Sequence, residues 1–221
     1  MTPDTLAAAL ARHAIDLPEG QVAMLDRYIR LLWQWNEKLN LTRHTDYEKF
    51  VARDLADSLA FARFLENGER VLDVGTGGGV PGVVLAIVRD DLKVELCESV
   101  GKRARAVADI VAGLGLPVPV HHGRAEGLLG TRGYDSLVVR AVARLRKLLE
   151  WFAPHWDRFG RLLILKGPGW IEERADARRL GLLHGLALRK LTSYPLPGTE
   201  SESVLLQVGP ADRLGKPESG T

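Results

Sequence analysis

DVGTGGGVPG, residues 73–82, is the segment of this chain that says most about its fold. It follows a short apolar run, Val71–Val74, and precedes a helical pattern, Gly82–Val88. Glycine has no Cβ, so a backbone this rich in glycine can turn sharply and approach a ligand closely. The motif therefore predicts a strand, a binding loop and a helix that hold a nucleotide-like ligand. No Lys-Ser or Lys-Thr pair follows, which excludes a P-loop, and the dinucleotide fingerprint begins several residues beyond the strand instead of at its end.

Downstream of this loop, short apolar runs alternate with helical patterns. We expect five strands, at Val71–Val74, Val94–Cys97, Val118–His121, Leu137–Val139 and Leu162–Leu165. We expect helices between them, at Gly82–Val88, Gly101–Ala112, Ala143–Trp156 and Trp170–Leu182. This alternation is typical of an α/β fold whose parallel sheet is covered on both faces. Two further runs, Leu186–Leu191 and Ser203–Val208, flank the turn Tyr194-Pro195-Leu196-Pro197-Gly198 and predict a C-terminal antiparallel hairpin, giving a mostly parallel seven-stranded sheet.

The residues before the first strand have helical periodicity. Gln21–Leu39 carries apolar side chains at spacings of three and four, and a second helix starts at the N-cap Asp46 and ends at Asn67-Gly68. Apolar content falls after Gly209. The sequence thus predicts an N-terminal helical extension (residues 1–66), a Rossmann-like domain (residues 67–208) and a disordered tail (residues 209–221).

Composition narrows the class of protein. Apolar residues make up 46% of the 221 residues and charged residues 26%, which is a globular balance. No apolar run approaches the length of a membrane span, and Asp4 and Arg12 interrupt the N-terminal apolar segment, so we expect a cytoplasmic protein without a secretory signal. Cys97 is the single cysteine, which excludes an internal disulfide and a thiolate zinc cluster, and we expect no metal.

Charged residues follow the next two predicted strands. Glu98 ends the second strand, where a carboxylate can accept hydrogen bonds from both hydroxyls of a ribose. Arg124-Ala125-Glu126 follows the third strand, and by its local pattern it equally indicates the start of a helix. Together with the glycine loop, these positions suit either NAD or S-adenosylmethionine. An NAD-dependent oxidoreductase and a methyltransferase therefore both remain open on these residues alone.

Further motifs point to one family. They are Trp35-Asn36-Glu37-Lys38-Leu39-Asn40-Leu41-Thr42, Asp57-Ser58-Leu59, residues 73–82, Lys102-Arg103, Arg124-Ala125-Glu126, Arg140-Ala141 and Lys166-Gly167. In order and spacing the chain resembles the bacterial small-subunit rRNA guanine-N7 methyltransferase family, RsmG, also called GidB, over roughly residues 20–208. One departure is visible, because the family usually has histidine after Arg53 and this chain has Asp54.

The resemblance implies a class I S-adenosylmethionine-dependent methyltransferase fold and a specific reaction. The methyl group would pass from S-adenosylmethionine to N7 of a guanine in 16S rRNA, guanosine 527 in the usual rRNA numbering. The resemblance places cofactor-binding roles at Gly75, Val80, Ala125, Glu126 and Arg140, with Glu98 at the ribose, and the glycine loop adds Gly77 as a further cofactor-binding candidate. The implied partner is 16S rRNA or the small ribosomal subunit, and we expect a monomer.

The expected chemistry needs no general base. Guanine N7 has an in-plane lone pair and is largely unprotonated at neutral pH, so catalysis consists of aligning N7, the methyl carbon and sulfur. We therefore name no catalytic base. Arg140 is a candidate for orienting cofactor or purine, and its alternative role is to pair with a nearby carboxylate. A cofactor-binding module without catalysis is the third alternative.

RNA-binding candidates come mostly from a basic segment. The formal net charge is +2, but residues 140–190 contain 12 basic and 5 acidic residues, a local excess of +7. Such an excess is compatible with a phosphate-facing surface, although helices with solvated arginine faces also produce it. The candidates are Arg124, Arg144, Arg146, Lys147, Lys166 and Asn36, of which Asn36 could instead cap the turn after its helix.

Overall fold

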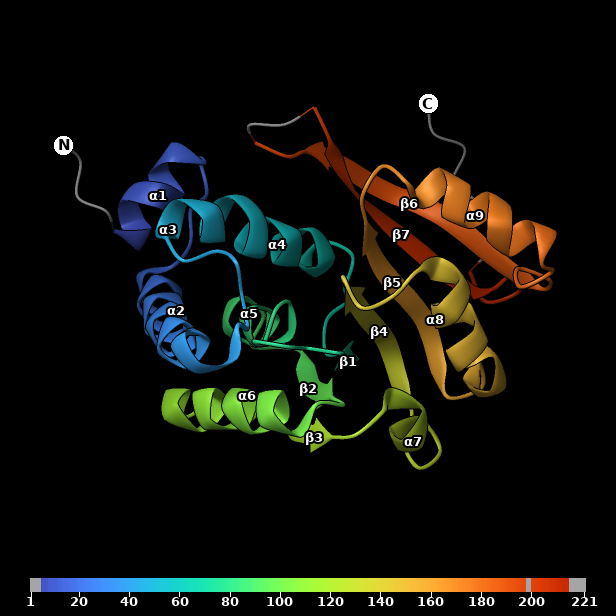
Figure 1. Ribbon diagram of the computed structural model, residues 1–221, viewed down its shortest axis with the longest axis horizontal. Coiled ribbons are helices and arrows are strands. Elements are labelled where there is room, and N and C mark those ends of the chain that lie inside the picture. Colours follow the sequence, from blue (N-terminus) through green and yellow to red (C-terminus); the bar gives the residue numbers. More distant parts are fainter. Residues whose placement is uncertain (1–4, 198–199, 215–221) are drawn as a thin grey trace.

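The computed structural model describes residues 5–197 and 200–214 and has an α/β architecture (Figure 1). Its strands are β1 (Arg70–Val74), β2 (Lys93–Glu98), β3 (Val120–His122), β4 (Tyr134–Arg140), β5 (Phe159–Lys166), β6 (Leu186–Pro195) and β7 (Glu202–Pro210). Its helices are α1 (Leu6–Arg12), α2 (Glu19–Leu39), α3 (Tyr47–Lys49), α4 (Ala56–Ala62), α5 (Gly82–Val88), α6 (Gly101–Leu114), α7 (Ala125–Leu129), α8 (Leu145–Phe152) and α9 (Trp170–Arg179). A π-helical segment, Phe50–Leu55, joins α3 to α4, and a 3₁₀ turn, Ala153–His155, follows α8.

The strands form one sheet in the order β3-β2-β1-β4-β5-β7-β6. Strands β1 to β5 pair in parallel, whereas β7 pairs antiparallel with both β5 and β6. The chain order reverses between β1 and β4, and an open parallel sheet binds ligands at the carboxyl ends of strands beside such a reversal. The predicted mostly parallel seven-stranded sheet with a C-terminal antiparallel hairpin is therefore confirmed.

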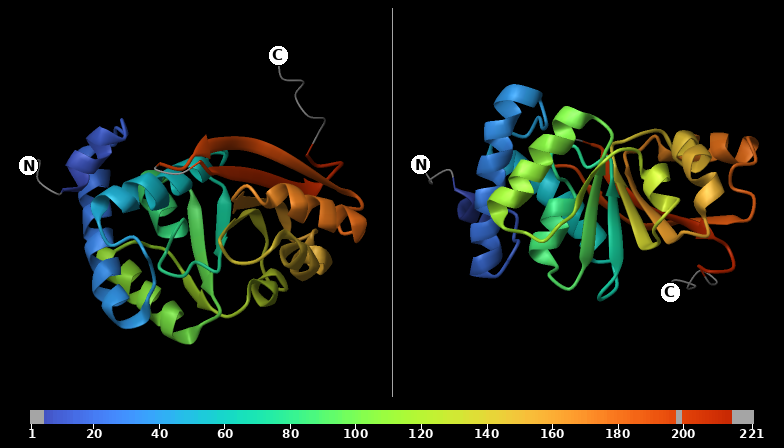
Figure 2. Two further views of the ribbon diagram at one scale, coloured as in Figure 1. Left: turned by 45° about the horizontal axis from the view of Figure 1, so that its top comes forward. Right: turned by 90° about the horizontal axis from the view of Figure 1, so that it is seen from below.

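Each face of the sheet is buried by its own set of helices. Successive strand residues point to opposite faces. Leu72 and Leu137 lie in a cluster with side chains from α7, α8 and α9, whereas their neighbours Val71 and Val138 lie in a cluster with the first helices, α5 and α6. Figures 1 and 2 show these two helical groups on either side of the twisted sheet. Because both faces are buried, the strands appear in the sequence as continuous apolar runs.

The helices before β1 share a hydrophobic core with the sheet. Leu25, Tyr28 and Phe61 are fully buried in the same cluster as Val71. The Tyr28 hydroxyl also donates a hydrogen bond to the carbonyl oxygen of Gly78 (2.9 Å), so α2 contacts the glycine loop directly. The division of the chain at residue 66 into extension and domain stays a prediction.

Several predicted bounds differ from the structure. The second N-terminal helix has the predicted N-cap, Asp46, but it contains a π segment, and α4 ends at Ala62, before the expected end at Asn67-Gly68. β6 continues to Pro195, beyond both the expected strand end at Leu191 and the expected start of the turn at Tyr194, because a strand end tolerates proline. α8 ends at Phe152, since Pro154 has no N–H with which to continue the helix.

The C-terminal end of the described chain stays on the sheet a little longer than expected. β7 runs to Pro210, two residues beyond the expected domain limit at residue 208. Gly198 of the expected turn and residues 215–221 of the expected tail lie outside the described residues. Within residues 5–197 and 200–214, no helix combines the length and apolar character that a membrane crossing requires.

Gly82 supports a prediction about packing between the sheet and α5. A Cβ at this position would overlap the Leu96 side chain and lie 2.7 Å from Asp73 Oδ2. We expect Gly82→Ala to lower the free energy of unfolding by about 1–3 kcal/mol, because buried side chains and backbone must shift to make room. Gly20→Ala is the matched control, since Gly20 is also helical and its Cβ would meet nothing within 4 Å. Denaturant unfolding measures both variants, and equal losses of stability would contradict the prediction.

Candidate functional site

The glycine loop after β1 adopts a backbone that glycine alone adopts readily. Gly75 has φ of 69° and Gly77 has φ of 59°, in the left-handed region. A Cβ at Gly75 would lie 2.7 Å from the Val142 side chain, whereas a Cβ at Gly77 would meet no atom closer than 4.0 Å, the Gly75 carbonyl oxygen. The backbone amides of Gly75 and Thr76 both donate to the Cys97 carbonyl oxygen, which ties the loop to β2.

Glu98, at the end of β2, supports the same loop. Its carboxylate accepts hydrogen bonds from the backbone amides of Gly77 (3.0 Å) and Val100 (2.8 Å), and the residue is buried. A carboxylate has about four lone-pair sites, so two acceptor positions remain for a ligand. The structure thus places Glu98 beside the glycine loop, and its contact with a ribose stays a prediction.

Asp73, at the start of the loop motif, fixes the loop to α5. Its Oδ2 accepts hydrogen bonds from the Thr76 hydroxyl (2.6 Å) and the Gly82 amide (2.8 Å). Burial raises the pKa of Asp73 from 3.8 to about 6, against the opposing effect of these two hydrogen bonds and of the positive Arg140. The loop conformation therefore depends on a buried acid that titrates close to neutral pH.

A first cavity opens at the carboxyl ends of β1, β2 and β3. It is lined by Val74, Gly75, Cys97, Ser99, Gly123, Arg124, Ala125, Glu126, Val142 and Trp151. The predicted residues Gly75, Ala125 and Glu126 therefore come together in one place. Val80, by contrast, packs against the hydrophobic core. Burial raises the pKa of the Cys97 thiol to about 12, so Cys97 is a wall of this cavity and not a reactive nucleophile.

Trp151 was missed by the sequence analysis. It comes from α8 and lines this cavity together with Gly75 of the glycine loop. The Arg124 guanidinium lies 5.9 Å from the centroid of the Trp151 ring, and its Nη1 lies 3.6 Å from Glu126 Oε1. The spacing of apolar residues predicts that Trp151 lies on an amphipathic helix, but it does not predict the contact between Trp151 and the loop after β3.

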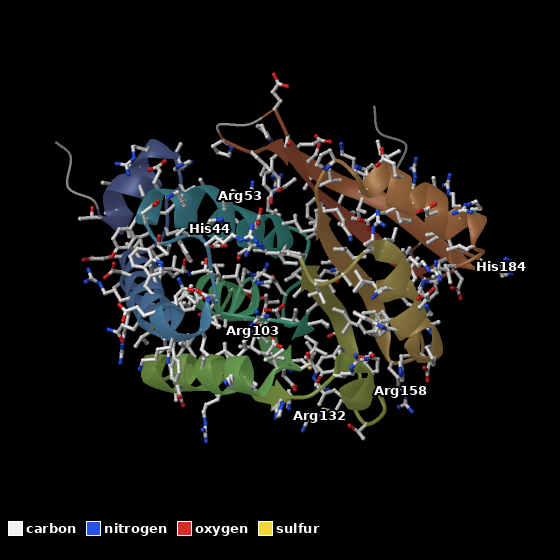
Figure 3. All side chains as sticks on the ribbon, in the orientation of Figure 1. His44, Arg53, Arg103, Arg132, Arg158 and His184 are labelled. Atoms are coloured by element: carbon white, nitrogen blue, oxygen red, sulfur yellow. The ribbon has the colours of Figure 1, made fainter. Side chains whose placement is uncertain are left out.

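A second cavity lies at the ends of β4, β5 and β7. It is lined by Arg53, Asp57, Val139, Arg140, Ala141, Val142, Ala143, Ile164, Leu165, Lys166, Gly167 and Ser203. Val142 lines both cavities, so they are neighbours. Ala141, which follows β4, has φ of 56°, a strained conformation for a residue with a Cβ. Arg53 comes from the π-helical segment Phe50–Leu55. Figure 3 shows Arg53 in the upper half of the view, far from Arg132 near the lower edge.

Arg140 is held between two buried carboxylates. Its Nη2 lies 2.7 Å from Asp54 Oδ1 and its Nε lies 2.8 Å from Asp57 Oδ2. His44 Nδ1 lies 2.9 Å from the other oxygen of Asp54, and the Tyr194 hydroxyl donates to the other oxygen of Asp57 (2.6 Å). Burial opposes the charge of Arg140, but the two carboxylates outweigh it and raise the pKa of Arg140. The contacts of Arg140 therefore match the alternative expectation, that it pairs with a nearby carboxylate. Asp54 is one of its two partners.

The RNA-binding candidates lie in different surroundings. Arg124 and Arg144 are exposed, as are Arg146 and Lys147. Arg146 forms a salt bridge with Glu150, whereas Arg144 and Lys147 form none with a described residue. The Lys166 ammonium is largely buried between Glu173 Oε2 (2.7 Å) and the Ala143 carbonyl oxygen (2.8 Å).

Asn36 has the capping role that the sequence analysis gave as its alternative. Its side-chain oxygen accepts a hydrogen bond from the Thr42 amide (2.8 Å) and closes the turn after α2, where Asn40 is left-handed. A contact between Asn36 and RNA stays a prediction.

The strand order, the glycine loop at the end of β1 and the two cavities at the carboxyl ends define a class I, Rossmann-like methyltransferase. A family profile described as rRNA small subunit methyltransferase G (GidB) matches residues 21–195. A Ribosomal RNA small subunit methyltransferase G from Rhodopirellula baltica is 47% identical over 194 residues, 88% of this chain and 84% of its own. One from Chromobacterium violaceum is 35% identical over 204 residues, 92% of this chain and 95% of its own. This chain belongs to the rRNA small subunit methyltransferase G family.

Solved structures support the fold at low sequence identity. TrmK of M. capricolum, in complex with S-adenosyl-homocysteine, has a TM-score of 0.56 at 12% identity, covering 70% of this chain and 67% of its own. The precorrin-6y C5,15-methyltransferase of Geobacter metallireducens has a TM-score of 0.54 at 13% identity, covering 77% and 92%. Both similarities concern the fold alone.

The raised pKa of Asp73 predicts a pH dependence of stability. Between pH 3.8 and about 6, folded Asp73 keeps a proton that the unfolded chain has lost. The contribution of Asp73 to the free energy of unfolding therefore falls as pH rises through this window, by roughly 3 kcal/mol in all. Asp73→Asn removes the titrating group, so the difference in unfolding free energy, wild type minus variant, should fall from about pH 4 to about pH 7. Chemical denaturation at several pH values measures it, and a flat or rising difference would contradict the assignment.

Proposed function

We propose that this chain transfers a methyl group from S-adenosylmethionine to N7 of a guanine in 16S rRNA, guanosine 527 in the usual numbering. The proposal rests mainly on the proximity of the two cavities, because Val142 lines both of them. A methyl donor in the first cavity would then lie beside a base in the second. Membership of the rRNA small subunit methyltransferase G family supports RNA as the substrate.

The first cavity fits the cofactor by its residues. The positive φ angles of Gly75 and Gly77 let the backbone approach a ligand without an intervening Cβ. Glu98 is held in place by two backbone amides and keeps acceptor positions for the ribose. Ala125, Glu126 and Trp151 line the same cavity, where Trp151 supplies an aromatic wall suited to an adenine ring.

The chemistry proposed here is positioning and electrostatics. S-adenosylmethionine supplies an electrophilic methyl group when bound, and guanine N7 attacks through its in-plane lone pair without losing a proton. The chain then has to bind both partners and hold N7 in line with the methyl carbon and sulfur. Arg140, fixed by Asp54 and Asp57, has a single preferred orientation at the second cavity. A preorganised group of this kind does not have to rearrange during the reaction.

The two alternative functions are separated by simple observations. Family membership argues against an NAD-dependent oxidoreductase, and calorimetry with NAD and with S-adenosylmethionine tests it directly. A binding module without catalysis would bind S-adenosylmethionine but transfer no methyl group.

Methyl transfer can be tested with purified components. We expect the chain to add one labelled methyl group to small ribosomal subunits that lack it, and mass analysis of nuclease digests should identify 7-methylguanosine. Turnover should persist with a chelator as long as the ribosomal substrate stays folded, because the proposed reaction uses no metal. Subunits that already carry the modification are the control and should accept no label. A methyl group on an exocyclic amine or a ribose would contradict the proposal.

We also propose that Arg144 and Lys147 contact RNA phosphates. Both residues lie at the start of α8, which directly follows the loop that lines both cavities. Neither forms a salt bridge with a described residue, so their charges are available to phosphates, whereas Glu150 compensates Arg146.

Replacing Arg144 and Lys147 together by Ala should weaken RNA binding and leave cofactor affinity unchanged. The slope of log affinity against log salt should become shallower by roughly 0.7 to 0.9 for each phosphate that the variant no longer binds, because fewer counterions are released. Replacing Arg178 and Arg179 of α9 by Ala removes the same charge elsewhere and serves as the matched control. Filter binding or fluorescence anisotropy over a salt series gives the slopes. Parental affinity and slope in the Arg144 and Lys147 variant would remove these residues from the RNA surface.

A further inference from the structure

Arg53 lines the second cavity, and its guanidinium lacks hydrogen-bond acceptors among the described residues. Three other charged side chains line that cavity, Asp57, Arg140 and Lys166, and each has an ion-pair partner. The Arg53 side chain makes no hydrogen bond or ion pair with another described residue. Its Nε is buried and has no hydrogen-bond partner.

Such an arrangement is unfavourable unless a ligand completes it. A buried donor without an acceptor loses its hydrogen bonds to water, and the loss is larger for a charged group. Overall charge does not forbid Arg53 here, because Asp54 and Asp57 together carry two negative charges and Arg140 carries one positive charge. Both carboxylates, however, are already hydrogen-bonded to Arg140, and to His44 and Tyr194 respectively. Arg53 is therefore tolerated electrostatically but left with unused donors.

The position of Arg53 is set by the π-helical segment. Arg53 and Asp54 are consecutive residues of the segment Phe50–Leu55. Asp54 pairs with Arg140, whereas Arg53 lines the cavity. The rest of the lining combines apolar side chains from the ends of β4 and β5 with Ser203 and the charged side chains of Asp57, Arg140 and Lys166. The cavity volume, about 240 Å³, lies below that of pockets for drug-sized ligands, so a single base or a phosphate is the size of group that can enter.

We propose that Arg53 binds an acceptor oxygen of the target nucleotide in the second cavity, a role that rests on the proposed rRNA methylation. Guanidinium groups donate to guanine edges and to phosphates. In guanine, the usual bidentate contact uses O6 and N7, but N7 accepts the methyl group and has to stay free. The oxygen is therefore O6 of the guanine or an oxygen of its phosphate, and the experiment separates the two.

The test uses the full chain with Arg53→Gln and Arg53→Lys. We expect Arg53→Gln to lower kcat/KM for the ribosomal substrate about tenfold to a hundredfold, as the loss of a charged hydrogen bond does, with S-adenosylmethionine affinity unchanged. Arg53→Lys retains the positive charge, so its kcat/KM should lie between those of the wild type and Arg53→Gln. It also provides the test if Arg53→Gln does not fold. Arg63→Gln is the matched control, because Arg63 is an exposed arginine just after α4 and lies outside both cavities.

Binding of guanosine and GMP to the same variants identifies the oxygen and does not depend on turnover. If Arg53→Gln weakens both ligands equally, Arg53 contacts the base, and if it weakens GMP alone, Arg53 contacts the phosphate. Either result supports the assignment even where the methylated atom proves not to be N7, so failure of the proposed function remains distinguishable. Unchanged nucleotide binding together with unchanged kcat and KM in Arg53→Gln would overturn it.

Discussion

The buried ion pairs of Arg140 are the interaction on which the arrangement of both cavities depends. They join β4 to the π-helical segment through Asp54 and to α4 through Asp57, and Tyr194 extends the network to β6. Buried charges are costly to desolvate, and removing one partner leaves the other uncompensated, so such a network constrains geometry more than it adds stability. Val142, which both cavities share, lies two residues after Arg140, so the wall between the cavities starts from this fixed point.

Asp54 shows what one substitution within a family can do to such a network. It stands where the resemblance to the family leads us to expect histidine, but the residue type alone assigned no role. In the structure Asp54 supplies a second carboxylate to Arg140, and His44, from the segment between α2 and α3, lies against its other oxygen. A chain with histidine at this position would have one carboxylate fewer beside Arg140. The surroundings of Arg140 in this chain therefore cannot be carried over to relatives that have histidine.

The fold followed from local sequence patterns, because buried parallel strands are apolar on both faces and therefore appear as continuous apolar runs. Gly75, Ala125 and Glu126 were assigned to one site by the family resemblance, and they lie together because the carboxyl ends of parallel strands meet at one edge of the sheet. Trp151 and Arg53 could not be predicted to line the cavities, because they reach them from α8 and from a π segment. Neither the meeting of separate helices with the sheet edge nor an unpartnered donor such as Arg53 Nε can be recognised before the side chains are placed in space.

The basic segment 140–190 illustrates how charge counted along a chain overstates charge offered to a partner. Part of its +7 excess is compensated from outside the segment: Asp54 and Asp57 pair with Arg140, and Glu69 pairs with Arg161. A count within the segment does not include these three carboxylates. Arg144 and Lys147 form no salt bridge with a described residue, so their charges remain available beside the loop that lines both cavities. Under the proposed function, phosphate contacts at these two residues would add counterion release to the fit of one nucleotide in the second cavity.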